Sequence, residues 1–444
     1  MCTLKTKTNH ILFLLFIIAL VPRVILVNDG LFHHDSVQLA KALENNDMTG
    51  AVGGRPGMML IYSLPYLIYP DAYIVATYMT ILFACLSVCM VFLLVKQLFD
   101  NTHIALTTAG LFSFCPLFLS ITTYAKSHAI GLFFILVALW FFVKSLKYDC
   151  YVWAFLAGFS FIYSLFVRID NVLYIPLFIF LYFYSDYIFK TKAKRYDLKY
   201  LYCLFLPIIL GLSIGLARGW LFKYGKDSLV LNFNKWLYLY TAGSLSLVDS
   251  IGLLTFIILV LSLFLLLKRK QDWLLIFCGL WFGTIFFPMV SLNVASARFF
   301  IGALIPLFIF ISFYLRSIKK GWICNIIFIS LVVFMYLSIM PILIVRNQYS
   351  SGKVMGELLG DIVGDGEYVL LGDNSVFAEY YGGVSVLSPN ANISGKSVYV
   401  MQHVIDLYDL NYTVIPVTSF DWEDYHHAEL KLKFRYETIY KVIQ

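Results

Sequence analysis

The sequence is poor in charged residues. Asp, Glu, Lys and Arg make up 13% of its 444 residues, whereas hydrophobic residues make up 61%. A water-soluble domain carries about 25% charged residues, so this composition excludes an ordinary soluble protein. Apolar runs of about 20 residues, long enough to cross a hydrocarbon core of ~30 Å, recur along most of the chain. The predicted class is a polytopic α-helical membrane protein.

Cysteine is missing from the polar end of the chain. None of the eight cysteines follows Cys324, and no pair has the CxxC spacing. Neither a disulfide framework nor a zinc site is therefore indicated. The net charge of +7 does not indicate nucleic acid as a partner, because membrane proteins concentrate Lys and Arg in their cytoplasmic loops. The chain also lacks internal repeats.

Apolar runs of suitable length predict about eleven membrane spans. They cover residues 11–27, 72–95, 104–122, 128–143, 151–167, 171–189, 200–217, 251–267, 273–291, 298–315 and 322–345. The first run has no small-residue cleavage site after it, so we expect it to be retained as a span. The apolar piece 58–70 is too short to cross and is expected to lie at the membrane interface.

The basic loops predict the orientation of these spans. If the N-terminus lies inside, the basic clusters at 190–199, 268–272 and 316–321 all fall on the cytoplasmic side. An odd number of spans then places the C-terminal tail outside. We therefore predict a multi-pass plasma-membrane protein with its C-terminal domain outside.

Two domains are predicted: a transmembrane domain at 1–345 and an α/β domain at 346–444. In the tail, helical and strand patterns alternate, which is typical of a largely parallel sheet. The helical patterns cover 352–363, 374–383 and 396–411, and the strand patterns cover 367–373, 384–388 and 412–419.

The first outer loop, 28–71, begins with residues 28–58, the longest polar stretch in the first half of the chain. It contains His33, His34 and Asp35, followed by the turn Gly53-Gly54-Arg55. The predicted topology places five further polar residues at outer span ends: Lys126, His128, Arg168, Asp170 and Arg298. A charge in the apolar zone costs roughly 2.5–3.5 kcal/mol, so such residues are usually paired or functional.

Several outer cations with few acids suit an anionic ligand such as a phosphate. Arg is favoured where planar, bidentate contact with phosphate is needed. The Gly53-Gly54 pair would let the backbone approach such a group closely. Asp35 is then a candidate general base for an attacking hydroxyl.

These residues also have simpler interpretations. Asp35 could cap a helix over residues 36–44, and Arg168 with Asp170 could form an interfacial ion pair. His128 could be a hydrogen-bonded residue at a helix end. No metal site is required by spacing, although His34 and Asp35 could hold a divalent metal with another outer carboxylate. A divalent metal is the one cofactor left open.

The order of these elements resembles the GT-C superfamily of integral membrane glycosyltransferases, in the branch of protein O-mannosyltransferases and aminoarabinose transferases. Asp35 stands at the position of that family's catalytic aspartate, and Gly54-Arg55-Pro56 is similar to its Gly-Lys-Pro-Pro turn. Residues 123–142 look like its S-x-E-A-R-x-Y-A-L run. Residues 156–176 are similar to its Gly-rich span ending in Arg-x-Asp, and Arg298-Phe299-Phe300 to its Arg-Tyr signature.

The chain departs from this pattern at two places. Many relatives have Asp-Glu or Asp-Asp where this chain has Asp35-Ser36. It also has Tyr124 and Lys126 where Glu and Arg are usual.

The resemblance implies a GT-C-like fold and a glycosyltransferase, of hexosyltransferase type, that uses a polyprenyl- or dolichyl-phosphate sugar. In an inverting displacement, Asp35 would deprotonate the hydroxyl of a lipid, glycan or protein acceptor. The leaving phosphate would be stabilised by four cations: Arg55, Lys126, Arg168 and Arg298. Four residues would support the site: His33, His34, His128 and Asp170.

Two other functions stay open. A transporter or flippase of a lipid-linked sugar would show repeated halves and charges near the midplane, whereas here the charges gather at one face. A non-catalytic membrane scaffold would use the tail as a binding module, with Asp35 dispensable.

Overall fold

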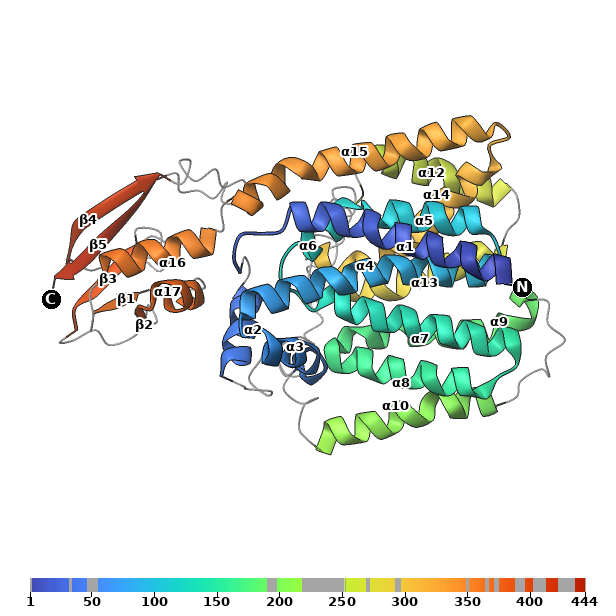
Figure 1. The fold of residues 1–444 in the computed structure, drawn as a ribbon, viewed down its shortest axis with the longest axis horizontal. Helices are drawn as coiled ribbons and strands as arrows, with labels where there is room; N and C mark the ends of the chain where they lie inside the picture. Colours follow the sequence, from blue (N-terminus) through green and yellow to red (C-terminus); the bar gives the residue numbers. More distant parts are fainter. Residues whose placement is uncertain are drawn as a thin grey trace.

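The computed structural model describes residues 2–31, 34–45, 55–189, 198–217, 251, 253–268, 272–291, 297–348, 351–363, 367–370, 375–387, 396–401, 413–421 and 436–443. In this part of the chain, a bundle of long helices stands beside a small β-sheet (Figure 1). The sheet lies beyond the end of the bundle that carries the short helices α2 and α3, and the N-terminus lies at the opposite end (Figure 1).

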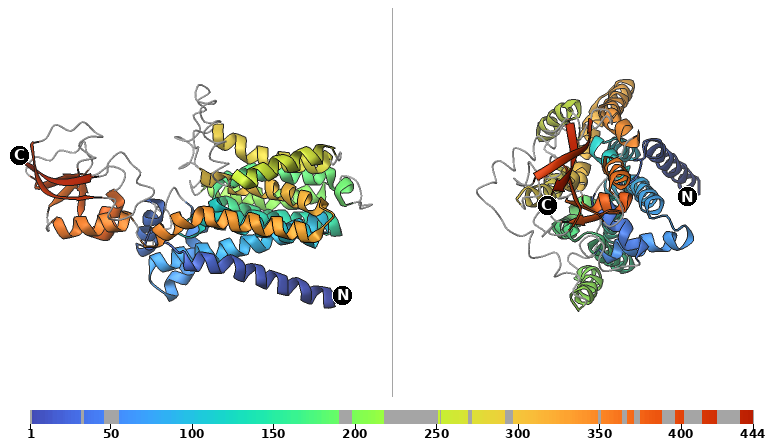
Figure 2. Two further views of the ribbon diagram at one scale, coloured as in Figure 1. Left: turned by 90° about the horizontal axis from the view of Figure 1, so that it is seen from above. Right: turned by 90° about the vertical axis from the view of Figure 1, so that its left-hand side faces the viewer.

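Most helices of the bundle run roughly along one common direction, and the short helix α6 is bent away from α5 (Figures 1 and 2). They are α1 (Cys2–Ile25), α4 (Ala72–Phe99), α5 (Thr102–Ser113), α6 (Pro116–Thr122), α7 (His128–Tyr148), α8 (Tyr151–Val167), α9 (Ile175–Phe189), α10 (Lys199–Ala217), α12 (Leu253–Lys268), α13 (Asp272–Ser291), α14 (Ile301–Ser317) and α15 (Gly321–Gln348). Shorter pieces are α2 (His34–Glu44), α3 (Pro56–Ile68) and the 3₁₀ helices η1 (Ile169–Tyr174) and η4 (Ala297–Phe300).

The predicted class, a polytopic helical membrane protein, agrees with this bundle. Six of the described helical segments are long and apolar enough to cross a membrane, and the bent pair α5–α6 would make a seventh span. Four further predicted spans correspond to the shorter apolar helices α8, α10, α12 and α13. The total of eleven therefore stays a prediction. The predicted interfacial piece forms α3, whose residues Leu64, Leu67 and Ile68 are exposed.

A buried arginine holds the break between α5 and α6, where the chain bends by 58°. Pro116 begins α6, and the guanidinium of Arg23 lies 4.8 Å from the centre of the Phe118 ring. Arg23 donates to the Ser113 carbonyl at 3.2 Å and to the Thr122 hydroxyl at 2.8 Å, so it joins α1 to both halves of the bent pair. A charge inside the bundle is tolerated when its donors are bonded in this way.

The tail forms a mixed sheet of strand order β2-β1-β3-β5-β4. The elements are α16 (Ser351–Ile362), β1 (Tyr368–Leu370), α17 (Ser375–Gly382), β2 (Ser385–Leu387), β3 (Val398–Met401), β4 (Thr413–Asp421) and β5 (Tyr436–Ile443). Strand β1 pairs in parallel with β2 and β3, whereas β5 pairs antiparallel with β3 and β4. The prediction of a largely parallel sheet is therefore wrong, because the last strand returns between β3 and β4.

One predicted helix of the tail is also wrong at its start. Residues 396–411 read as helical, but Val398–Met401 form the central strand β3. Val398, Tyr399 and Val400 are all buried, so this strand is covered on both faces and shows no alternation. Periodicity alone does not separate such a run from a buried helix.

Candidate functional site

The chain between α6 and α7, residues 123–127, is the turn around which the site is built. The Asn28 amide donates to the Thr123 carbonyl at 2.9 Å. The Ser36 hydroxyl, which is fully buried, donates to the Ala125 carbonyl at 2.6 Å. These bonds tie the start of the first loop and the first turn of α2 to the 123–127 turn.

Ser36 explains one departure from the family pattern. An ionised carboxylate has no hydrogen to donate, so an acid at this position could not make the bond to Ala125. This chain therefore uses the position to anchor α2. Because α2 begins at His34, Asp35 lies in its first turn and not at the capping position before it.

Two of the predicted cations meet at Ser127. Arg55 Nη1 donates to the Ser127 hydroxyl oxygen at 2.8 Å, and Arg168 Nη1 donates to the same atom at 3.2 Å. Arg168 also donates two hydrogen bonds to the Asp170 carboxylate, with Nε–Oδ1 and Nη2–Oδ2 distances of 2.9 Å each. Two donations occupy both lone pairs of a hydroxyl, so the Ser127 hydrogen is left to point toward an acceptor.

A second cluster surrounds the ring of Phe299. The guanidinium carbons of Arg168 and Arg298 lie 5.2 and 5.3 Å from its centre, within the range of cation–π attraction. The His128 ring meets it edge-on, with 5.5 Å between ring centres. These residues, with Asp170, line a cavity of about 30 Å³ between α7, η1 and η4.

His128 is buried beside this cavity, with 7% of its surface exposed. Within the described part of the chain, neither ring nitrogen has a hydrogen-bond partner. The interpretation of His128 as a hydrogen-bonded helix-end residue is therefore wrong, although it does begin α7. A buried polar group without a partner costs about 1–3 kcal/mol, which a ligand in the cavity would recover.

The predicted cations all act electrostatically on His128. They are Arg55, Lys126, Arg168 and Arg298. Two unit charges ~6 Å apart repel by about 3 kcal/mol at an effective dielectric constant of ~20, so such a cluster favours an anion among its members. The structure thus brings these four positions together around His128, and their role as phosphate ligands stays a prediction.

Local packing fixes two of these cations. The Lys126 backbone exchanges hydrogen bonds with the Thr80 hydroxyl, at 3.2 and 3.3 Å, and its side chain is buried. Gly131 faces Arg168, and a Cβ there would lie 3.0 Å from both Cγ and Cδ of the arginine. A larger residue at position 131 would therefore displace the Arg168 side chain.

Some predicted residues lie outside what the structure describes. His33, Gly53 and Gly54 are outside the described residues. His34 and Asp35 belong to α2 by their backbone, but their side chains are outside the described set. Within that set, no three His, Cys, Asp or Glu residues gather as metal ligands, and the predicted metal site at His34 and Asp35 stays an expectation.

Sequence reasoning missed Ser127 and Phe299 as members of the site. Ser127 stands between two residues that were singled out, Lys126 and His128, and Phe299 follows Arg298 directly. Neither residue is ionisable, so neither stood out in an apolar chain. They belong to the site because the neighbouring arginines donate hydrogen bonds to Ser127 and lie over the ring of Phe299.

Residues 56–214 match the family model of dolichyl-phosphate-mannose-protein mannosyltransferases. No functionally curated protein was found to match the sequence. Among solved structures, ArnT from Cupriavidus metallidurans bound to undecaprenyl phosphate has a TM-score of 0.66 at 10% identity, with 97% of both chains covered. The oligosaccharyltransferase AglB from Archaeoglobus fulgidus, in complex with an inhibitory peptide and a dolichol-phosphate, has a TM-score of 0.54 at 11% identity. That match covers 85% of this chain and 64% of AglB. The solved structures show a shared fold, and the match over residues 56–214 agrees with the resemblance to the GT-C superfamily.

Proposed function

We propose that this membrane protein, which has the GT-C glycosyltransferase fold, moves a sugar from a polyprenyl- or dolichyl-phosphate donor to an acceptor hydroxyl. The observation that carries the proposal is the convergence of Arg55 and Arg168 on Ser127, beside the His128 ring, whose nitrogens have no partner among the described residues. Two relatives in fold are solved with such lipid phosphates, ArnT with undecaprenyl phosphate and AglB with dolichol-phosphate.

The donor phosphate would lie at the mouth of the cavity beside Phe299. The cavity volume of about 30 Å³ has room for little more than one water-sized group, so only one phosphate oxygen would enter it. There His128 would donate a hydrogen bond to that oxygen. Ser127 would donate its hydrogen to a second oxygen, and Arg55 and Arg168 would supply charge-assisted contacts.

This arrangement suits a leaving group that gains negative charge. As the bond from the anomeric carbon to the phosphate oxygen breaks, its electron pair stays on the phosphate. Donors that are already in place stabilise that charge without reorganising during the reaction. Asp170 would keep the Arg168 guanidinium oriented through its two-point contact.

Asp35 is proposed as the general base. It would take the proton of the acceptor hydroxyl while the acceptor oxygen attacks the anomeric carbon, which inverts the configuration there. The bond from Ser36 to the 123–127 turn supports this role, because it holds the first turn of α2 beside the residues that contact the phosphate.

The proposed setting is the outer face of the plasma membrane, with the tail on the same side. The acceptor would be a hydroxyl-bearing lipid, glycan or protein. His34 and Asp35 would hold a divalent metal, which would supply polarisation of the acceptor hydroxyl. Loss of transfer in EDTA that is restored by the metal would support this site.

Transfer of a labelled sugar tests the function. Membranes that contain the protein, supplied with a radiolabelled polyprenyl-phosphate sugar, are expected to form a labelled covalent product. Replacing the base removes about two to four powers of ten in rate, so Asp35→Asn should reduce product formation by that factor. Normal transfer by the variant would rule out Asp35, and donor movement across liposomes without any product would instead support a transporter.

A further inference from the structure

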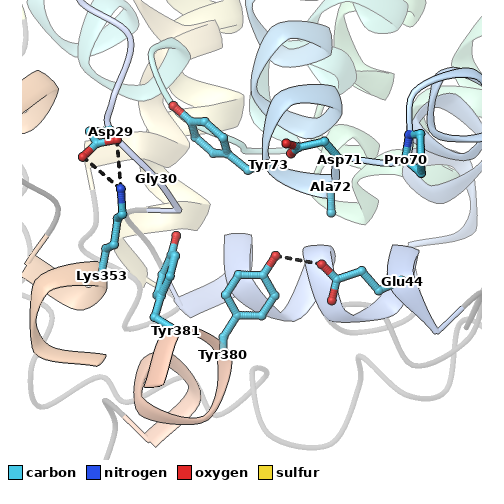
Figure 3. A pocket seen from close by; sticks show the side chains of 10 residues that line it. All are labelled: Asp29, Gly30, Glu44, Pro70, Asp71, Ala72, Tyr73, Lys353, Tyr380 and Tyr381. Carbon is cyan, nitrogen blue, oxygen red and sulfur yellow. Dashed lines mark hydrogen bonds and ion pairs between the residues drawn. The ribbon is translucent and has the colours of Figure 1, made fainter. Parts of the chain in front are cut away.

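A second, larger cavity lies between the first loop and the tail (Figure 3). Its volume of about 360 Å³ falls in the range of ~300–1,000 Å³ that is common for small-molecule sites. Its walls come from three segments: the first loop with α2, the start of α4, and the tail helices α16 and α17. None of the residues that line it belongs to the site around Ser127.

The tail is fastened to the first loop around this cavity. Lys353 forms an ion pair with Asp29 at 3.3 Å, and the Leu31 amide donates to the Tyr381 hydroxyl at 2.6 Å. Gly30 has a φ of +84°, and a Cβ there would lie 2.9 Å from the Tyr381 oxygen. A residue with a side chain would therefore be strained at position 30 and would disturb this approach.

The cavity presents hydrogen-bonding groups of both kinds to a ligand. Glu44 takes the Tyr380 hydroxyl hydrogen on Oε1 at 2.8 Å, which leaves Oε2 able to accept from a ligand (Figure 3). Tyr381 accepts from Leu31, so its own hydrogen is left to be donated. Burial raises the pKa of Tyr380 and of Tyr381, so both phenols keep their hydrogens at neutral pH.

The charge of the cavity selects against anions. Asp29, Glu44 and Asp71 face one lysine, Lys353, so a phosphate or carboxylate ligand would be repelled. Carboxylate oxygens accept hydrogen bonds and do not donate them, which matches ligands with several hydroxyls. The flat ring of Tyr73 adds an amphipathic wall of the kind common in binding sites.

We propose that this cavity binds a neutral sugar unit of the acceptor, an inference that rests on the proposed function. Helix α2 connects the two sites, with Asp35 in its first turn and Glu44 at its end, about 14 Å further along the helix axis. An acceptor held at Glu44, Tyr380 and Tyr381 would extend its reacting hydroxyl along α2 toward Asp35. The tail is then a part of the acceptor site.

Binding of simple sugars to the full-length protein in nanodiscs tests the proposal. Saturation-transfer-difference NMR with lactose, maltose and mannobiose is expected to show binding of at least one of them, and none of glucuronic acid. Glu44→Gln keeps the size of the side chain and its contact with Tyr380 but removes the charge, and should weaken binding about tenfold. The matched control is Glu379→Gln, which breaks the 2.6 Å ion pair to Lys41 between the same helices but does not line the cavity.

The outcomes separate this inference from the proposed function. Weakened binding in Glu44→Gln with unchanged binding in Glu379→Gln supports the cavity as the sugar site. Equal binding in both variants, no binding of any neutral sugar, or binding of a threonine-rich peptide alone overturns it. Hydrolysis of the labelled donor in the absence of acceptor reports on the Ser127 site alone. If the wild-type protein does not hydrolyse the donor, that result counts against the proposed function and not against the sugar site.

Discussion

The Ser127 hydroxyl lies between two arginines and orients both of them in the proposed phosphate site. Its oxygen accepts from Arg55 and from Arg168, so the two arginines are held together and the hydroxyl hydrogen is turned away from them. His128, the next residue, is buried with no partner for its ring nitrogens in the described part of the chain. Both side chains thus offer hydrogen bonds that a phosphate can accept.

Removing the Ser127 hydroxyl is expected to slow transfer. Ser127→Ala deletes a hydrogen bond to a charged group and frees the two arginines to separate, so kcat/KM should fall about tenfold to a hundredfold. Ser145→Ala is the control, because that hydroxyl bonds to the Phe142 carbonyl near the other end of α7. Equal activity of Ser127→Ala and wild type would remove Ser127 from the phosphate site.

The position of Arg168 depends on the small size of Gly131. Gly131→Ala would push a methyl group to 3.0 Å from the Arg168 side chain, so the guanidinium must shift by a few tenths of an ångström. Transfer is expected to fall about tenfold with little change in melting temperature. Gly283→Ala is the matched control, since its added methyl meets only the Phe287 ring at 3.5 Å. A large loss of stability in Gly131→Ala would indicate a packing role instead.

At the scale of elements, the bent pair α5–α6 delivers the 123–127 turn to the site. Arg23 holds both halves of the pair, and α6 ends at Thr122, directly before the turn. The turn that follows this bend, between the end of α6 and the start of α7, carries the Ser127 hydroxyl that Arg55 and Arg168 contact.

Replacing Arg23 is expected to destabilise the protein. Arg23→Met keeps an unbranched side chain but leaves the buried Ser113 carbonyl at the end of α5 without this donor, at about 1–3 kcal/mol for an unsatisfied buried group. The melting temperature in detergent should drop clearly, whereas Arg316→Gln, at an exposed helix end, should leave it unchanged. An unaltered melting temperature in Arg23→Met would show that the break does not need this residue.

At the scale of the whole molecule, the sequence predicted which charged residues share one end of the bundle. The spacing of apolar runs decides which loops face the same side, so Arg55, Arg168 and Arg298 could be grouped without coordinates. The contacts of Ser127 and the lack of a partner for His128 among the described residues could not be predicted, because both depend on which side chains pack around them. The sheet of the tail was predicted only in part, since β3 is buried on both faces and β5 returns from a distant stretch.

The likeness to ArnT and AglB concerns the fold, at 10% and 11% identity, so the residues of this chain must carry the argument about its chemistry. The same end of the bundle holds the cation cluster and, along α2, the cavity against the tail. Donor and acceptor would then meet beside the first turn of α2. The central claim is that the Ser127 cluster is where the donor phosphate binds.

A structure of the protein with bound undecaprenyl phosphate tests that claim most directly. The phosphate is expected within hydrogen-bond distance of Ser127 and His128, with Arg55 and Arg168 on either side. Density for the phosphate at the cavity between the first loop and the tail, or anywhere away from Ser127, would contradict it.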